Sequence, residues 1–136
     1  MANKHILISY QWDHQDRAIK IRDKLQQAGY RVWIDVNMME DNLLNAMAKG
    51  VDEAGAILMC ISSKYKASAN CQAEANYAFK LKKPIIPVKV EKDYEADGWL
   101  GIVIGTSLYF NAYSDDVMEK TWPQLLRQLE SVAKKN

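Results

Sequence analysis

The stretch AILMCISSKYKASANCQAEANYAFKLKKPIIPV, residues 56–88, decides the fold, because it holds two short apolar runs on either side of an amphipathic segment. The first run, 56–63, is the most apolar in the chain and predicts a buried central strand. A loop over 64–70 leads to a helix that we expect from Asn70 to Lys83, and the second run, 84–90, predicts another strand. Strand, helix and strand in this order are typical of a crossover in a parallel sheet.

Three prolines help to place the ends of these elements. Pro84 stops the helix before it, because its ring fixes the backbone and it has no N–H to donate. Pro87 lies inside the second apolar run, where it predicts a strand end or a weakly bonded ladder. Pro123 is expected near the first turn of a last helix over residues 115–135, where a proline is tolerated.

The same alternation continues on both sides of the opening stretch. We expect strands at 5–10, 30–35 and 106–111 and helices at 17–29 and 43–55. Residues 91–101 are expected to form a loop with one helical turn. Asp13 could cap the first helix, and Gly29 ends it. We therefore predict an α/β, flavodoxin-like three-layer sandwich, with a five-stranded parallel sheet in the order 2-1-3-4-5 and helices on both faces.

Composition excludes several classes of function. The chain has 136 residues, with 18 basic and 17 acidic side chains and a net charge of +1, so neither nucleic acid nor an anionic membrane is favoured as a partner. The N-terminus lacks the pattern of a signal peptide, and the longest apolar run is far too short to insert into a membrane, so we expect a cytoplasmic protein. Two cysteines without a CxxC or His/Cys cluster predict free thiols and no metal site.

Glu74 stands out on the helix that follows the central strand. On a helical wheel of about 100° per residue with Cys71 as origin, Ala75, Ala78 and Phe79 define an apolar face, and Glu74 falls at its edge, at about −60°. Its carboxylate could interact with the dipole of the helix N-terminus. It could instead face a ligand in the crevice past the carboxyl ends of strands one and three, where the topology places this helix start. A capping box is excluded, because position 71 is not Ser or Thr.

Several segments together resemble a known family. HILISYQWDHQD, GYRVWIDVNMMED, AGAILMCISSKY, SANCQAEANYA and IIPV are similar, in order, to the successive segments of Toll/interleukin-1 receptor (TIR) domains. LISY resembles the family's first box, LYFN its third, and NCQAE its Cys-x-x-Glu. The resemblance covers essentially the whole chain. It implies a single TIR domain over residues 1–136, excised from a larger multidomain protein.

The resemblance implies one of two functions. Some TIR domains cleave NAD+ at the nicotinamide–ribose bond, and in them a glutamate on the third helix is catalytic; here that residue is Glu74. Such an NAD+ nucleosidase would give nicotinamide and ADP-ribose or a cyclic ADP-ribose, in immune or cell-death signalling. It would be activated by TIR–TIR self-assembly into a homotypic oligomer or filament. NAD+ would be the substrate, with no cofactor. The alternative is a non-enzymatic signalling scaffold that acts through TIR–TIR interactions alone.

The loop after the second strand bears on this choice. Residues 33–42, WIDVNMMEDN, lack the Arg-Asp-x-x-Pro-Gly of receptor TIR domains and look closer to the enzymatic members. The loop differs from many enzymes in having no glycine, and Asn70 stands where the enzymes often have Trp. Under the scaffold alternative, residues 37–42 and the helix surfaces would contact other TIR domains.

Candidate contacts for the substrate lie around the expected crevice; they are Ser9, Tyr10, Gln11, Trp33, Asp35, Asn70 and Cys71. Trp33 could stack on nicotinamide or adenine, and Asp35 could bond a ribose hydroxyl. For each of them a purely structural role is the alternative. Lys64 and Lys66 could meet phosphates or lie in a solvated loop. Because the chain has no G-x-G-x-x-G or Walker loop, NAD+ would not sit as a Rossmann cofactor.

Overall fold

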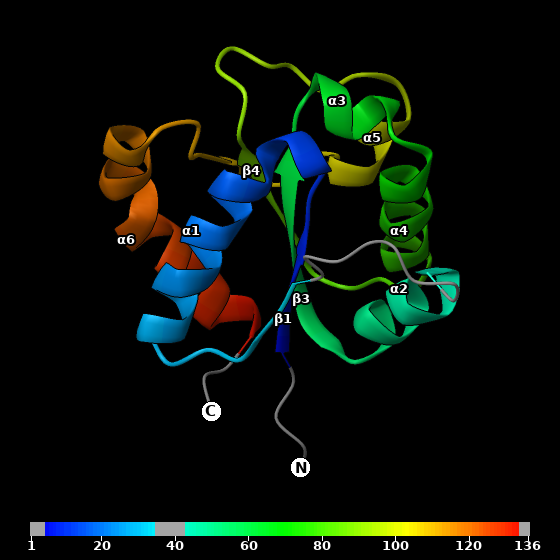
Figure 1. The fold of residues 1–136 in the computed structure, drawn as a ribbon, viewed down its shortest axis with the longest axis horizontal. Coiled ribbons are helices and arrows are strands. Elements are labelled where there is room, and N and C mark those ends of the chain that lie inside the picture. The colour runs from blue at the N-terminus through cyan, green and yellow to red at the C-terminus, as the bar shows by residue number, and fades with distance from the viewer. Residues whose placement is uncertain (1–4, 35–42, 134–136) are drawn as a thin grey trace.

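A parallel five-stranded sheet forms the centre of the molecule (Figure 1). The computed structural model describes residues 5–34 and 43–133. The strands are β1 (His5–Ser9), β2 (Val32–Trp33), β3 (Ala54–Ile61), β4 (Ile85–Lys89) and β5 (Phe110–Asn111), in the order β2-β1-β3-β4-β5. The predicted flavodoxin-like order is therefore confirmed, and β3 is central, since it pairs with β1 on one side and β4 on the other.

Helices cover both faces of this sheet (Figure 1). They are the 3-10 helix η1 (Trp12–His14) and the α-helices α1 (Gln15–Gln27), α2 (Leu43–Asp52), α3 (Ser63–Ala67), α4 (Ala69–Lys80), α5 (Gly98–Ile104) and α6 (Asp115–Val132). Helices α1 and α6 lie on one face, and α2, α4 and α5 on the other. No helix of the described part of the chain is both long enough and apolar enough to cross a membrane.

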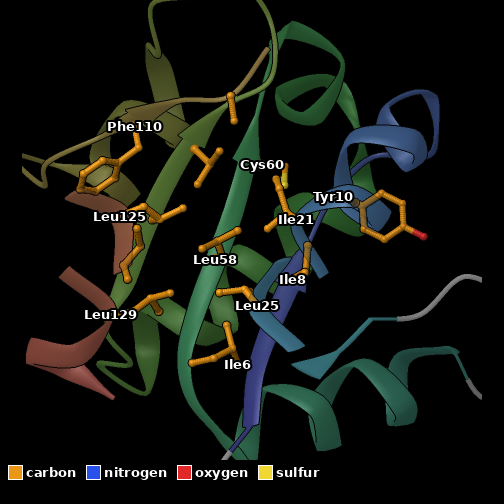
Figure 2. Packing of buried hydrophobic residues seen from close by; sticks show 14 of the residues in the cluster. Ile6, Ile8, Tyr10, Ile21, Leu25, Leu58, Cys60, Phe110, Leu125 and Leu129 are labelled. Carbon is orange, nitrogen blue, oxygen red and sulfur yellow. The ribbon is translucent and has the colours of Figure 1, made fainter. Parts of the chain in front are cut away.

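Successive residues of each strand point to opposite faces, which divides the core in two. Ile8 and Leu58 pack with Leu25 of α1 and Leu129 of α6, as Figure 2 shows. Leu7 instead belongs to the cluster under α2, α4 and α5. Both faces of β1 and β3 are therefore buried, which explains why these strands are continuous apolar runs.

Helix α3 was not expected, since residues 64–70 were predicted to form a loop. Ser62 caps it, accepting a hydrogen bond at Oγ from the N–H of Tyr65 at 3.0 Å. The Tyr65 side chain is fully buried in the cluster under α4 and α5. A helix of one turn shows no amphipathic period, so the cap and the buried tyrosine, rather than a sequence pattern, define it.

Helix α4 ends earlier than predicted, at Lys80 rather than Lys83. Lys82 adopts a left-handed conformation with φ of 58°, and Lys83 donates its N–H to the carbonyl of Ala78 at 3.1 Å. This left-handed termination, rather than Pro84, stops the helix. Phe79, predicted on the apolar face, is 50% exposed, because the helix packs on the sheet mainly through small residues.

Prolines elsewhere also behave differently from prediction. Pro87 lies inside β4, where it pairs in register with Met59. The carbonyl of Lys89 accepts a hydrogen bond from the N–H of Ala112, on the side of β5. Because backbone groups two residues apart in a strand point to the same side, the nitrogen of Pro87 also faces β5. Pairing with β5 begins only at Val88. The missing N–H of Pro87 therefore leaves the ladder to β3 intact, so Pro87 does not end the strand, and the ladder that is absent at Pro87 is the one to β5. Pro123 lies in the interior of α6 rather than near its first turn, since Ser114 caps that helix.

The remaining differences concern the ends of elements. Asp13 does not cap α1; the side chain of Gln11 instead accepts from the N–H of Asp13 and caps η1. Gly29 follows α1 with a φ of 97°, as predicted for its end. Strands β2 and β5 are shorter than predicted, because both lie at an edge of the sheet and end where pairing ends. Helix α5 is longer than the one turn predicted there.

Candidate functional site

Glu74 lies in the second turn of α4, half-buried, on the side that faces β1 and α2. Helix α4 begins at Ala69 and has no acidic residue in its first turn. The interaction of a carboxylate with the helix dipole falls off within that first turn, so the dipole does not explain Glu74. Ser68 caps the helix, accepting from the N–H of Cys71 at 3.2 Å.

A chain of hydrogen bonds holds the Glu74 carboxylate. Ser9 Oγ donates to Glu74 Oε1 at 2.5 Å, and the same Oγ lies 2.7 Å from Tyr65 Oη. Ser9 ends β1, and Tyr65 lies on α3, so three separate elements meet here. Burial raises the pKa of the Tyr65 phenol well above its usual value, so this side chain is a neutral hydroxyl.

A cavity of about 30 Å³ reaches Glu74. Besides Glu74, the cavity is lined by residues of β1 and just after it, of β2 and of α2. They are Leu7, Ile8 and Tyr10, then Trp33, and then Ala46, Met47 and Gly50. This volume is comparable to that of a single water molecule. The cavity as it stands therefore has room for water beside the carboxylate but not for a nicotinamide ring.

Trp33 forms the wall of this cavity next to the sheet edge. Its ring lies 5.0 Å from the His5 ring, centroid to centroid, and a Cβ added to Gly50 would stand 3.5 Å from the indole. His5 Nε2 donates to the carbonyl of Gly50 at 3.0 Å, and burial lowers the pKa of His5. A neutral His5 thus fixes the start of β1 to α2 and supports the Trp33 ring.

Larger hollows adjoin this cavity on two sides. A hollow of about 160 Å³ lies between α2 and α4 and shares Met47 and Glu74 with the cavity. On the other side of Trp33, an open groove of about 420 Å³ is lined by His5, Arg22, Gln26, Arg31, Val32 and Ile34. A ligand too large for the cavity could extend into either.

The structure brings some of the predicted contact residues to Glu74 and places others elsewhere. Tyr10 and Trp33 line its cavity, whereas Gln11 is engaged in the cap of η1 and Asn70 is exposed at the start of α4. Cys71 is buried, and its Sγ donates to the carbonyl of Tyr10 at 3.6 Å. Burial raises the pKa of the Cys71 thiol to about 11. Asp35 and the loop 37–42 lie outside the described residues.

Sequence reasoning missed Tyr65, and it placed two lysines in a solvated loop. Lys64 and Lys66 lie on α3, where Lys64 pairs with Asp13 and Lys66 with Asp97, each at 2.6 Å. Both lysines thus already have carboxylate partners. The one sequence signal for Tyr65 is the Ser-x-x-Tyr spacing after a strand, in which Ser62 can cap the turn that carries the tyrosine.

Comparison with known proteins gives the following matches. The model of a family described as "TIR domain" matches residues 6–129. The crystal structure of the TIR domain of the Toll-related receptor TRR-2 from Hydra magnipapillata is similar, with a TM-score of 0.74 and 14% identity over 94% of this chain and 99% of that one. The TIR domains of the activated Roq1 resistosome, which recognises the pathogen effector XopQ, give a TM-score of 0.58 and 14% identity over 97% of this chain and 82% of that one. None of the curated proteins matches this chain.

Proposed function

The chain belongs to the TIR domain family, and from this premise we propose that it is an NAD+ nucleosidase, which breaks the bond between nicotinamide and ribose. The observation that carries the proposal is the setting of Glu74. Its carboxylate is half-buried beside a cavity, away from the first turn of its helix, and is anchored by Ser9. A carboxylate that lines a cavity and is fixed by a donor in the core is placed to contact a ligand there.

The chemistry requires one carboxylate and no general acid. Nicotinamide in NAD+ is a cationic leaving group, so when the C–N bond breaks its electron pair stays with the ring nitrogen and neutralises it. The ribose carbon that remains is oxocarbenium-like, and Glu74 would stabilise its positive charge. Attack by water, which then loses a proton to solvent, would give ADP-ribose. Attack by a nitrogen of the adenine ring would give a cyclic product.

Binding of NAD+ would require the site to open. The cavity beside Glu74 has room for about one water, so Trp33 or Met47 of α2 would have to move to admit nicotinamide. The rest of the dinucleotide would extend into the groove on the other side of Trp33, where Arg22 and Arg31 could meet its phosphates. Tyr10 would contact the ring, and Asp35 the ribose.

The test is NAD+ consumption by concentrated protein, with identification of the products. We expect nicotinamide and either ADP-ribose or its cyclic form. Glu74→Gln, which keeps the size of the side chain, should lower kcat at least about a hundredfold, as loss of a group that stabilises developing charge does. Glu119→Gln changes an exposed carboxylate on α6 in the same way and should leave the rate unchanged. An unchanged rate in Glu74→Gln would refute the assignment.

A non-enzymatic scaffold is the second candidate, and exposed apolar side chains favour it. Ile102 of α5 is 71% exposed, and Leu108 and Tyr109 before β5 are 67% and 51% exposed. Apolar surface of this kind is typical of contacts with other proteins. Under this proposal homotypic TIR–TIR contacts in the cytoplasm, within a larger protein, would transmit an immune or cell-death signal. Self-association without NAD+ turnover in the same assay would favour it. The two candidates are compatible if assembly activates cleavage.

A further inference from the structure

We propose that Tyr65 and Ser9 are positioning residues, which hold the Glu74 carboxylate through a hydrogen-bond chain that runs in one direction, from Tyr65 to Ser9 to Glu74. The effect on turnover rests on the proposed function; the effect on Glu74 itself does not. The chain joins the turn of α3, the end of β1 and the second turn of α4.

Counting hydrogens fixes the direction. Each hydroxyl has one hydrogen to donate, and an ionised carboxylate can only accept. Ser9 Oγ lies 2.5 Å from Glu74 Oε1 and 2.7 Å from Tyr65 Oη, so its single hydrogen goes to Glu74 and Tyr65 must donate to Ser9. Ser9 is 1% exposed and Tyr65 is fully buried, so solvent does not compete for either hydroxyl.

This direction suits the ionised form of Glu74. If Glu74 were protonated and donated to Ser9, the Ser9 hydrogen would turn to Tyr65. The Tyr65 hydrogen would then have to leave the chain inside a dry core, which costs free energy. Each donor also strengthens the next, because a hydroxyl that accepts a hydrogen bond becomes a better donor. Tyr65 therefore acts on the carboxylate although it does not touch it.

Among the described residues, two ionisable side chains near Glu74 do not change their protonation near pH 7. Burial raises the pKa of Tyr65 well above its usual value and that of Cys71, on α4, to about 11. Both are neutral near pH 7. Helix α2 faces Glu74 across the cavity with the apolar or backbone groups of Ala46, Met47 and Gly50. Tyr77 lines the hollow between α2 and α4.

The Tyr65 hydroxyl is itself held in place. Ser62 caps the turn that carries it, and its ring packs against that of Trp99 on α5, with centroids 6.3 Å apart. Trp99 Nε1 donates to the carbonyl of Lys66, also on α3, at 3.1 Å. Helices α3 and α5 thus form a rigid support behind Glu74, which gives the short α3 a role beyond connection.

The first test is enzymatic and uses Tyr65→Phe, which removes one hydroxyl and keeps the packed ring. We expect kcat to fall about tenfold with KM nearly unchanged, and the acid limb of the pH profile of kcat to move to higher pH, because a carboxylate that loses hydrogen-bond support protonates more easily. Ser9→Ala should have a larger effect. The double variant should be no worse than Ser9→Ala, since Tyr65 acts through Ser9. Tyr94→Phe is the matched control; Tyr94 is also buried in the cluster under α4 and α5, its hydroxyl lies outside the chain, and the loss of that hydroxyl should change neither kcat nor the profile.

The second test does not depend on activity. The carboxyl carbon of Glu74 is followed by NMR during a pH titration of the whole chain without NAD+. We expect its midpoint to move to higher pH in Ser9→Ala, by less in Tyr65→Phe, and not at all in Tyr94→Phe. Amide spectra check that each variant is folded. A Glu74 midpoint that is the same in all folded variants would overturn the inference even if the protein cleaves NAD+. If the midpoints move and NAD+ is not cleaved, the inference stands and the proposed enzyme function fails.

Discussion

The two faces of the sheet bury different kinds of side chain. Under α1 and α6 the core is mainly aliphatic, with Leu25 and Leu58 among its largest fully buried side chains (Figure 2). Under α2 and α4, the Ser9 and Tyr65 hydroxyls form a hydrogen-bond chain to the Glu74 carboxylate, which lines a small cavity. Buried polar groups and a cavity stabilise a fold less than close aliphatic packing does. We therefore expect that stability rests mainly on the first face, whereas the second carries the polar groups of the candidate site.

Leu25→Ala should give the largest change in stability. Leu25 is fully buried on α1, so its loss removes apolar contacts and leaves a cavity. We expect the free energy of unfolding to fall by about 2–5 kcal/mol, measured by urea denaturation. Glu74 should titrate as in the wild type wherever the variant is folded. Leu44→Ala removes an exposed leucine from α2 and should change stability by at most about 0.5 kcal/mol. Similar losses for both variants would remove the distinction between the faces.

Reversing the charge of the groove should come next in size. Arg22 and Arg31 line it together, so Arg22→Glu with Arg31→Glu would repel phosphates. We expect KM for NAD+ to rise at least about tenfold with kcat nearly unchanged, because under the proposed function the groove would bind the phosphates of the substrate without taking part in bond cleavage. Arg127→Glu, on an exposed position of α6, is the control for a charge reversal away from the groove. An unchanged KM would place the phosphates elsewhere.

The contrast between the faces also explains what the sequence could predict. The order of the strands follows from apolar runs that alternate with amphipathic ones, and runs such as 56–61 are buried on both faces. The wheel placed Glu74 at the edge of the buried face, because that edge depends only on helical spacing. The same wheel failed for Phe79, since small residues bring α4 close to the sheet and leave the larger ring at the surface.

The partner of Ser9 could not be predicted. Tyr65 lies 56 positions away from Ser9 and reaches it only because a single capped turn follows β3. Neither a turn of that length nor a contact of that range leaves a periodic signal in the sequence. The end of α4 was missed for a similar reason, because Lys82 adopts a left-handed conformation that favours Gly or Asn. Local pattern thus located the carboxylate, and only tertiary structure revealed its support.

The smallest expected effect concerns surface charge on the aliphatic face. Asp115, at the start of α6, pairs with Lys20 at 2.9 Å and Arg17 at 2.8 Å on α1. Hydrogen bonds from Lys20 and then Arg17 hold the pKa of Asp115 below its ordinary value of 3.8. Because the pKa is lower in the folded than in the unfolded chain, the pairs stabilise the fold above pH 3.8, and this contribution disappears as the pH falls through the folded-state pKa.

Asp115→Asn should therefore lower stability slightly near pH 7 and leave it unchanged at a low pH below the folded-state pKa, where the carboxyl is protonated in both states. The change at pH 7 should be small, because the carboxylate is exposed and its ion pairs are screened by solvent. Denaturation of both proteins at the two pH values measures the difference. A loss as large as that of Leu25→Ala would mean that the ion pairs between α1 and α6, rather than the aliphatic packing beneath them, hold this face together. A loss that persists unchanged at that low pH would mean that Asp115 acts through its position in the first turn of α6 and not through its charge.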